Sequence, residues 1–232
     1  MKFLALLPLL CFLGCGYLVK NNLDAQQQLD VCSEVLLSAV DDLEVNEGFP
    51  RAVKEGDYAW TCTGHTAWTS GFFPGMLWYL YEHSHNDLLK LKAEAYTENL
   101  RPVKELGWGT HDLGFMMFCS VGNAYRITGD EKYKIWLLET ADSLAGLFNP
   151  AVGTIHSWPW MQKKRGWPHN TIIDNMMNLE LLLWASRNGG SQHLYDIAVS
   201  HAQNTLKNQF RDDFSIYHVV VYDNQSSEVL SR

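Results

Sequence analysis

The chain has 232 residues, of which 47% are hydrophobic, and this is enough for a sizeable core and excludes a disordered chain. The formal net charge of −8 is spread along the sequence without long charged runs, which argues against nucleic acid or an anionic membrane surface as a partner. Nine Trp and ten Tyr suit both a core and a cleft in which sugars stack on flat rings.

Residues 1–20 have the pattern of an export signal. Lys2 precedes an apolar run from Phe3 to Leu13, which is too short to anchor a protein across a bilayer. The small residues beside Cys15 resemble a bacterial lipoprotein processing site. We therefore expect an exported protein, periplasmic or in the outer membrane, with a lipid anchor at Cys15 or plain cleavage of the signal as alternatives. The folded domain is expected over 24–232.

Helical periodicity dominates the chain from residue 24 onward. In the first segment, apolar residues recur every three or four positions from Leu29 to Leu43. Pro74 fits the first turn of a helix, and Pro102 would strain the end of one. A strand is indicated only by the β-branched run from His218 to Tyr222. The expected helices cover 24–43, 72–83, 86–105, 113–127, 130–147, 175–187 and 191–209.

These helical segments alternate in character. Three of them (72–83, 113–125 and 175–186) are apolar nearly all round, whereas each following segment keeps a charged face. A helix that is apolar on all sides must be buried, and an amphipathic helix covers it from outside. The pattern predicts an all-α toroid, here an incomplete barrel of about three and a half helix pairs. Self-association through the open edge of such a barrel is an expected consequence.

Three cysteines remain outside the export segment, and they do not make a complete disulfide framework. The neighbours of Cys32, Cys62 and Cys119 are mostly apolar or aromatic, which favours buried free thiols. His83 and His85 follow the second helix, where a solvated helix end is favoured over a metal site because further ligands are lacking. No phosphate-binding Gly loop, Ser-His-Asp arrangement or Cys-pair motif is recognisable, so no metal or cofactor is implied.

Polar residues stand directly before the apolar helices. Asp112 precedes one and Asp174 another. A single Asp in this place is usually a helix cap, because its carboxylate accepts bonds from free amides and favours the helix dipole. Two Asp residues at the same end of successive inner helices instead suggest paired carboxylates facing one cavity. Such pairs carry out acid and base chemistry on sugars.

Four motifs resemble those of glycoside hydrolase family 88, the unsaturated glucuronyl hydrolases. They are WTSGFFPG at 68–75, HDLGF at 111–115, IIDNMMNL at 172–179 and HVVVYD at 218–223. The resemblance runs from about residue 50 to the end and implies an (α/α)6 barrel. It implies that Asp174 is the general acid and base and Asp112 the second essential carboxylate. The positions where the family lines its sugar pocket are Trp68, His111, Trp158 and His218.

The resemblance implies a specific reaction on the unsaturated uronyl oligosaccharides that polysaccharide lyases produce, glycosaminoglycan fragments included. Asp174 would donate a proton to carbon 4 of the unsaturated uronate, and water would add at carbon 5. The acid must hold its proton near working pH, and the apolar neighbours at 172–173 and 176–177 are expected to favour this. The motifs leave open which glycosaminoglycan is degraded.

Family 88 proteins continue through about as many helices again beyond the block that matches Tyr222. We therefore expect the chain to be truncated relative to these proteins, and three possible functions remain. It could be a working hydrolase, an inactive or sugar-binding remnant of one, or a member of the related unsaturated rhamnogalacturonyl hydrolases. The residues of the motif at 172–179 favour the unsaturated glucuronyl hydrolases over the rhamnogalacturonyl hydrolases.

Overall fold

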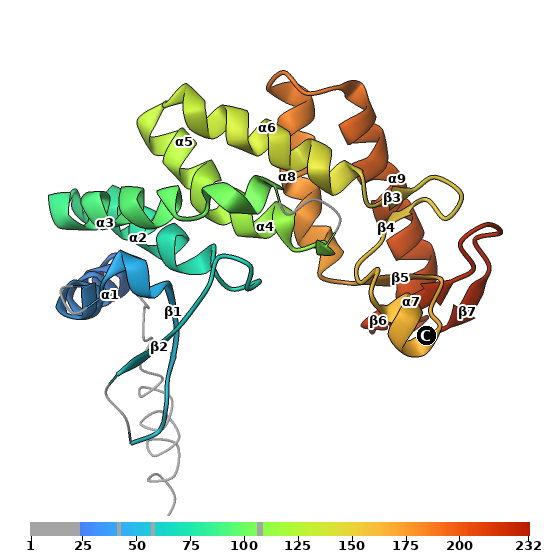
Figure 1. The fold of residues 1–232 in the computed structure, drawn as a ribbon, viewed down its shortest axis with the longest axis horizontal. Coiled ribbons are helices and arrows are strands. Elements are labelled where there is room, and N and C mark those ends of the chain that lie inside the picture. Colours follow the sequence, from blue (N-terminus) through green and yellow to red (C-terminus); the bar gives the residue numbers. More distant parts are fainter. Residues whose placement is uncertain (1–23, 41–42, 57–58, 106–108) are drawn as a thin grey trace, which may run out of the picture.

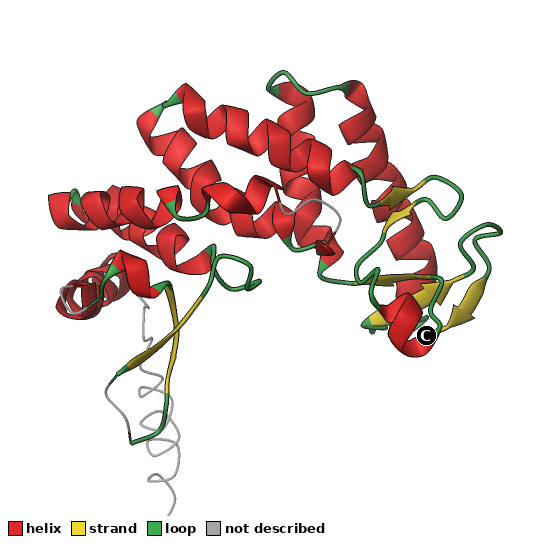
Figure 2. Cartoon of the chain, viewed as in Figure 1, coloured by secondary structure: helices red, strands yellow, loops and turns green. Residues whose placement is uncertain are grey.

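The computed structural model describes residues 24–40, 43–56, 59–105 and 109–232 (Figure 1). The proposed export segment and Cys15 lie outside these residues. Helices form most of the molecule, and short strands lie at its periphery (Figure 2). The α-helices are α1 (Ala25–Val40), α2 (Phe72–Ser84), α3 (Asp87–Glu98), α4 (Leu113–Met117), α5 (Asn123–Thr128), α6 (Glu131–Ala145), α7 (Met161–Arg165), α8 (Asn175–Arg187) and α9 (Gln192–Gln209).

The helices pack as inner and outer pairs. Helix α2 packs on α3, α4 and α5 pack on α6, and α8 packs on α9, while α1 lies against the first pair. Inner helices supply fully buried side chains, such as Trp78 of α2, Met116 of α4 and Leu182 of α8. This arrangement confirms the predicted all-α fold, an incomplete toroid. In the described residues it has three helix pairs, with α1 and the short α7 outside them.

The predicted helix ranges agree with the structure to within a few residues, with two differences. The segment expected over 86–105 ends as α-helix at Glu98 and resumes as a 3₁₀ helix at Arg101–Glu105, because Pro102 has no amide to donate. The segment expected over 113–127 contains a π-helical turn at Phe118–Gly122. There the Ser120 hydroxyl donates to the carbonyl oxygen of Met116 at 2.6 Å, a bond that competes with the regular helical pattern.

The structure contains more strands than the sequence predicted. Strand β6 (Val219–Tyr222) lies where it was expected, but it is the centre of a sheet with β5 (His169–Ile172) and β7 (Val229–Ser231). β5 is fully buried and mostly polar, so it shows no apolar alternation, and its partner is distant in sequence. Two antiparallel pairs were also missed: β1 (Phe49–Val53) with β2 (Trp60–Thr63), and β3 (Phe148–Asn149) with β4 (Thr154–Ile155).

Glycines let the inner helices approach at their N-terminal ends. A Cβ atom on Gly71, which precedes α2, would lie 2.0 Å from the carbonyl oxygen of Met116 in α4. A Cβ atom on Gly114 of α4 would lie 2.5 Å from Oδ1 of Asn178 in α8. Side chains larger than hydrogen do not fit at these contacts. The beginnings of α4 and α8, where Asp112 and Asp174 stand, are therefore held side by side.

The three cysteines of the described chain are free thiols. Cys62 and Cys119 are partly buried, but Cys32 is exposed, so the expectation of burial was wrong there. Cys32 lies on α1, where Ser33 and Val40 are the buried residues and the side chain of Cys32 is exposed. Within the described residues, no helix is both long enough and apolar enough to cross a membrane.

Candidate active site

Asp112 and Asp174 occupy the residues directly before α4 and α8, as expected. Neither side chain accepts a hydrogen bond from the first amides of its helix, and both residues already have helical backbone angles. Helix capping therefore does not account for either carboxylate. Both are left available for other partners.

The carboxylate of Asp112 is held from two sides. The hydroxyl of Thr110 donates to its Oδ2 atom at 2.7 Å, and the amide of Asp112 donates to the same hydroxyl oxygen at 3.2 Å. The other carboxylate oxygen, Oδ1, lies 3.2 Å from Nε2 of His111. This geometry fixes the plane of the carboxylate.

His111 is almost fully buried, with 1% of its side chain exposed. Its Nδ1 atom lies 2.9 Å from the carbonyl oxygen of Ser157, which can only accept, so Nδ1 donates. Burial lowers the pKa of His111 and outweighs the opposite effect of Asp112, so the ring is neutral at neutral pH. The lone pair of Nε2 then lies beside the Asp112 carboxylate, and Nε2 makes no hydrogen bond within the described residues.

Trp158 links His111 to His218. Its ring centre lies 6.2 Å from that of His111 and 6.4 Å from that of His218. The Nδ1 atom of His218 lies 3.7 Å from Oδ1 of Asp174, and both side chains are about half exposed. The negative charge of Asp174 also acts on the pKa of His111. Five of the six predicted site residues thus form one continuous group.

Trp68 is the predicted site residue that this group does not include. Its ring contacts Phe72 edge to face, with 6.0 Å between centres, and Phe72 stacks on Phe115 at 5.7 Å. Half of the Trp68 side chain is exposed, at 51%. Its contacts lead to α2 and α4 rather than to the carboxylates, so its role in sugar binding stays a prediction.

A buried amide network supports the site, and the sequence did not reveal it. Asn175 donates from Nδ2 to the hydroxyl of Ser157 at 2.7 Å, and Asn178 donates to Oδ1 of Asn175 at 3.0 Å. Oδ1 of Asn178 accepts from the amide of Phe115 at 3.0 Å. The network ties α8 to α4 and to the loop that carries Trp158. The sequence feature that could have indicated this network is the presence of two asparagines, Asn175 and Asn178, in an otherwise apolar helix.

The apolar enclosure expected around Asp174 is only partial. Ile172 is buried, but Met176 and Met177 are 37% and 50% exposed. The side chain of Asp174 itself is 45% exposed. In the described part of the chain, this carboxylate therefore faces an open side.

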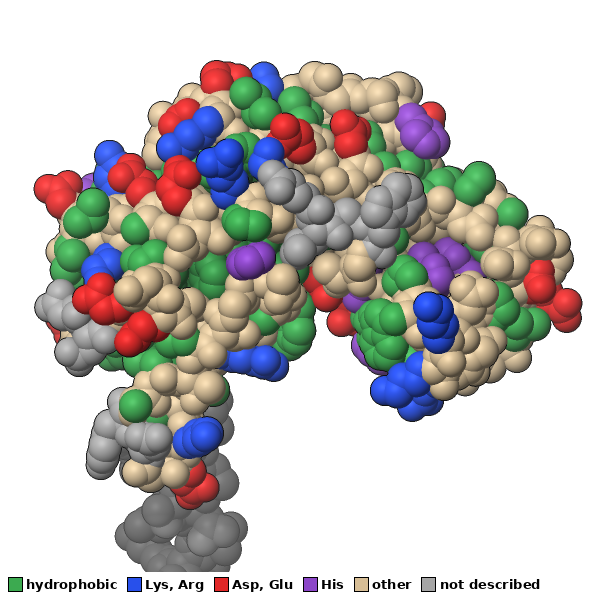
Figure 3. Space-filling model, in the orientation of Figure 1, with side chains coloured by type: hydrophobic (Ala, Val, Ile, Leu, Met, Phe, Trp, Pro, Cys, Tyr) green, Lys and Arg blue, Asp and Glu red, His purple; other side chains and the backbone are tan. Residues whose placement is uncertain are grey.

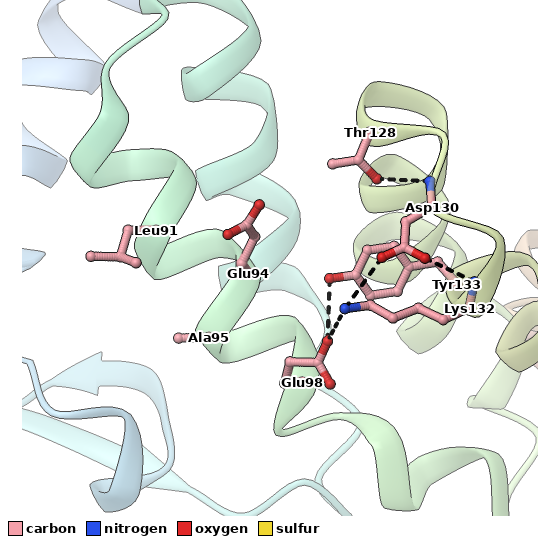
Figure 4. Close-up of a pocket in the computed structure, with 8 residues that line it drawn as sticks. All are labelled: Leu91, Glu94, Ala95, Glu98, Thr128, Asp130, Lys132 and Tyr133. Atoms are coloured by element: carbon pink, nitrogen blue, oxygen red, sulfur yellow. Dashed lines mark hydrogen bonds and ion pairs between the residues drawn. The ribbon is translucent and has the colours of Figure 1, made fainter.

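Two further features have structural explanations. A pocket of about 420 Å³ lies between outer helices α3 and α6 (Figure 4). Three of its four charged groups bind one another, since Lys132 pairs with Glu98 at 2.7 Å and with Asp130 at 3.4 Å. His83, weighed above as a metal ligand, lies 2.7 Å from Asp30 and joins α2 to α1.

No protein-family model matches the chain, but individual relatives do. It is 42% identical to an unsaturated glucuronyl hydrolase of Formosa agariphila over 166 residues, which cover 71% of the chain and 41% of that protein. It is 33% identical to an unsaturated chondroitin disaccharide hydrolase of Streptococcus pneumoniae, covering 74% of the chain and 43% of that protein.

Solved structures agree. An unsaturated glucuronyl hydrolase specific for heparin superposes with a TM-score of 0.82 and 39% identity, covering 89% of the chain and 54% of that structure. The enzyme from Bacillus sp. GL1 gives a TM-score of 0.78 and 26% identity, covering 88% and 54%. The chain spans about half the length of the relatives it matches. Over this part of their length, the chain is homologous to the unsaturated glucuronyl hydrolases of glycoside hydrolase family 88.

Proposed function

We propose that the chain removes a terminal unsaturated uronate from oligosaccharides made by polysaccharide lyases. One observation supports this most strongly. Two carboxylates, Asp112 and Asp174, stand at the ends of adjacent inner helices without capping them, and the rings of His111, Trp158 and His218 connect the two. Paired carboxylates beside flat rings suit acid and base chemistry on a sugar.

In the proposed reaction, Asp174 donates its proton to carbon 4 of the double bond. Positive charge then develops at carbon 5 and on the ring oxygen, and the negative charge of Asp112 stabilises it. The Asp174 carboxylate takes a proton from the water that adds at carbon 5. The resulting hemiketal opens to a ketone, and the freed hemiacetal releases the second sugar without a glycosyl-enzyme.

The exposed side of Asp174 gives the substrate access. His218, 3.7 Å from the carboxylate and 59% exposed, can donate a hydrogen bond to the uronate or to the attacking water. Trp158 supplies a ring face beside it. The names of the relatives refer to chondroitin disaccharides and heparin, so we propose unsaturated glycosaminoglycan fragments as the substrate class.

The chemistry can be tested with deuterium. In D₂O, the product should carry one deuterium at carbon 4, delivered to a single face because a fixed acid transfers it. Nuclear magnetic resonance of the released keto acid reads this directly. Deuterium distributed equally over both faces would indicate cleavage at the anomeric carbon followed by spontaneous tautomerisation, and would contradict the proposed reaction.

A sugar-binding protein without turnover is the second candidate, and the half-exposed state of Asp174 and His218 favours it. A binding protein would retain affinity for an unsaturated disaccharide but would not consume the double bond. Calorimetric titration together with the deuterium experiment separates the two functions.

The face between the inner helices is also a proposed contact surface. A groove of about 540 Å³ lies there, lined by rings and apolar side chains from α2, α4, α5 and α8, among them Phe72, Tyr79, Met177 and Trp184. We propose that a second copy covers it by self-association. Sedimentation at rising concentration would show a dimer, which Tyr79→Arg would dissociate; a monomer throughout would contradict this.

Export and a lipid anchor at Cys15 also stay proposals, testable by cell fractionation.

A further inference from the structure

Asn170 is a fully buried polar residue that the proposed reaction does not use. It lies in β5, the strand that ends two residues before Asp174. Its side chain is directed at the backbone of Trp158, a residue in the loop that precedes α7. Burying an amide is unfavourable unless its donors and its acceptor are satisfied. The partners of Asn170 therefore show which part of the chain it holds.

The side chain of Asn170 holds both backbone polar groups of Trp158. Its Oδ1 atom accepts from the Trp158 amide at 3.1 Å, and its Nδ2 atom donates to the Trp158 carbonyl oxygen at 3.0 Å. The same carbonyl oxygen also accepts from the amide of Met161 at 3.0 Å. A backbone amide can only donate and a carbonyl can only accept, so the two bonds to Asn170 fix the orientation of its side-chain amide.

The second hydrogen of Nδ2 faces His156. Nδ2 lies 3.1 Å from Nε2 of His156, and because Nδ2 is a donor, this ring nitrogen accepts. Burial lowers the pKa of His156 to about 4, which keeps the ring neutral and its acceptor free at neutral pH. His156 in turn stacks on His169, with 4.5 Å between ring centres. Figure 3 shows histidine side chains gathered on the lobe that carries β5 and α7. Both donors and the acceptor oxygen of Asn170 are thus occupied.

The preceding residue, Ser157, is fixed as well. Its amide donates to the backbone carbonyl oxygen of Asn170 at 2.9 Å, and its own carbonyl oxygen accepts from Nδ1 of His111 at 2.9 Å. The two residues Ser157 and Trp158 therefore have all four of their backbone polar groups bound, three of them by Asn170. Since β5 leads to Asp174, these bonds tie the position of the Trp158 ring to that of the proposed acid.

We propose that Asn170 is a positioning residue, which holds the ring of Trp158 in the orientation in which a sugar stacks on it. The inference rests on the proposed function, in which Trp158 supplies a ring face beside Asp174. Asn170 is itself fully buried and out of reach of a substrate. Its contribution is preorganisation, because a ring that is already ordered loses less conformational freedom when a sugar binds. Loss of the Asn170 side chain therefore weakens substrate binding and leaves the proton transfer from Asp174 largely intact.

Equilibrium binding of an unsaturated chondroitin disaccharide tests this role in a double-mutant cycle. All proteins of the cycle also carry Asp174→Asn, so that the probe is not consumed. The cycle compares the parent, Asn170→Ala, Trp158→Ala and the combination of the two. The matched control is Asn149→Ala. Asn149 of β3 also holds loop backbone, donating to one carbonyl oxygen at 3.0 Å and accepting from one amide at 2.9 Å.

Asn170→Ala should weaken binding at least about fivefold, since two hydrogen bonds of this kind together are worth a factor of about 5 to 150 in an equilibrium constant. In the Trp158→Ala background the same substitution should have no further effect, because the ring that it positions is gone. In the chain with Asp174 intact, Asn170→Ala should raise KM by the same factor and keep kcat within about threefold, which a general loss of structure would not do. Asn149→Ala should bind the probe like the parent.

Equal losses of affinity with and without the Trp158 ring would overturn the proposal, because Asn170 would then act on the whole fold. Unchanged binding by Asn170→Ala, a lower kcat at unchanged KM, or no binding of the probe by the parent would overturn it as well. If Asn170→Ala does not fold, Asn170→Asp takes its place, since it has the same shape but removes both donors, and the same outcomes apply. Failure of the hydrolase proposal would appear separately, as a double bond that the chain with Asp174 intact does not consume, whereas the binding cycle requires no turnover.

Discussion

Nε2 of the buried His111 lies 3.2 Å from Oδ1 of Asp112. Since Nδ1 of the ring is bound to the carbonyl of Ser157 and burial keeps the imidazole neutral, Nε2 offers a lone pair rather than a proton. Asp112 thus has one oxygen oriented by the Thr110 hydroxyl and the other directed at a base. The hydrogen bond from Thr110 therefore sets the position of this second carboxylate.

Removing the hydroxyl of Thr110 should slow turnover. Thr110→Val keeps the shape of the side chain but leaves Oδ2 of Asp112 without its 2.7 Å donor. A hydrogen bond to a charged group is worth about 1.5–3 kcal/mol, so we expect kcat to fall at least about tenfold with KM nearly unchanged. Thr110→Ser retains the donor and should keep most of the activity. A Val variant within twofold of the parent in kcat would show that this bond does not position Asp112 for the reaction.

Adding a methyl group at Gly114 should separate the two inner helices. The new Cβ atom would lie 2.5 Å from Oδ1 of Asn178, which also accepts from the amide of Phe115. We expect Gly114→Ala to lower the free energy of unfolding by about 1–3 kcal/mol, as overpacking does, and to lower activity. Gly64→Ala, where a Cβ atom meets nothing within 4 Å, is the control for calorimetric melting. Equal melting temperatures for both variants would mean that α4 and α8 are not in close contact here.

The fold was largely predictable because helix periodicity and all-round apolarity are local features of the sequence. Asp112 and Asp174 were predictable for a related reason, since each stands where a polar loop meets an apolar helix. β5 was not predictable, because its polar residues are satisfied by partners far away in the chain, as in the bond between His169 and Thr154 at 2.9 Å. The amide network of Asn175 was not predicted for the same reason, because its partners Ser157 and Phe115 are also distant in sequence.

Buried histidines should make the fold sensitive to acid. Burial lowers the pKa of His156 to about 4, of His169 to about 3 and of His201 to about 4, whereas an unfolded histidine titrates near about 6.5. Between these values the unfolded state binds more protons, so stability is full above about pH 6.5 and falls as the pH drops. Each group contributes a slope of up to about 1.4 kcal/mol per pH unit.

Urea unfolding at pH 7.5, 6.0 and 5.0 measures this slope. His193→Gln, at an exposed position of α9, should leave the slope unchanged, and His169→Gln should reduce it by about one proton. A free energy of unfolding that is constant or higher at pH 5.0 than at pH 7.5 would contradict the assignment of buried neutral histidines.

The most direct test of the central claim follows the absorbance of the double bond between carbon 4 and carbon 5 of an unsaturated chondroitin disaccharide. The chain is compared with its Asp174→Asn variant, after both are shown to be folded by circular dichroism. We predict that the unmutated chain consumes the double bond and that the variant is slower by a factor of about 10² to 10⁴, the usual contribution of a positioned acid. Equal rates for the two proteins, or no consumption by the folded unmutated chain, would contradict the assignment of Asp174 as the proton donor of a working hydrolase.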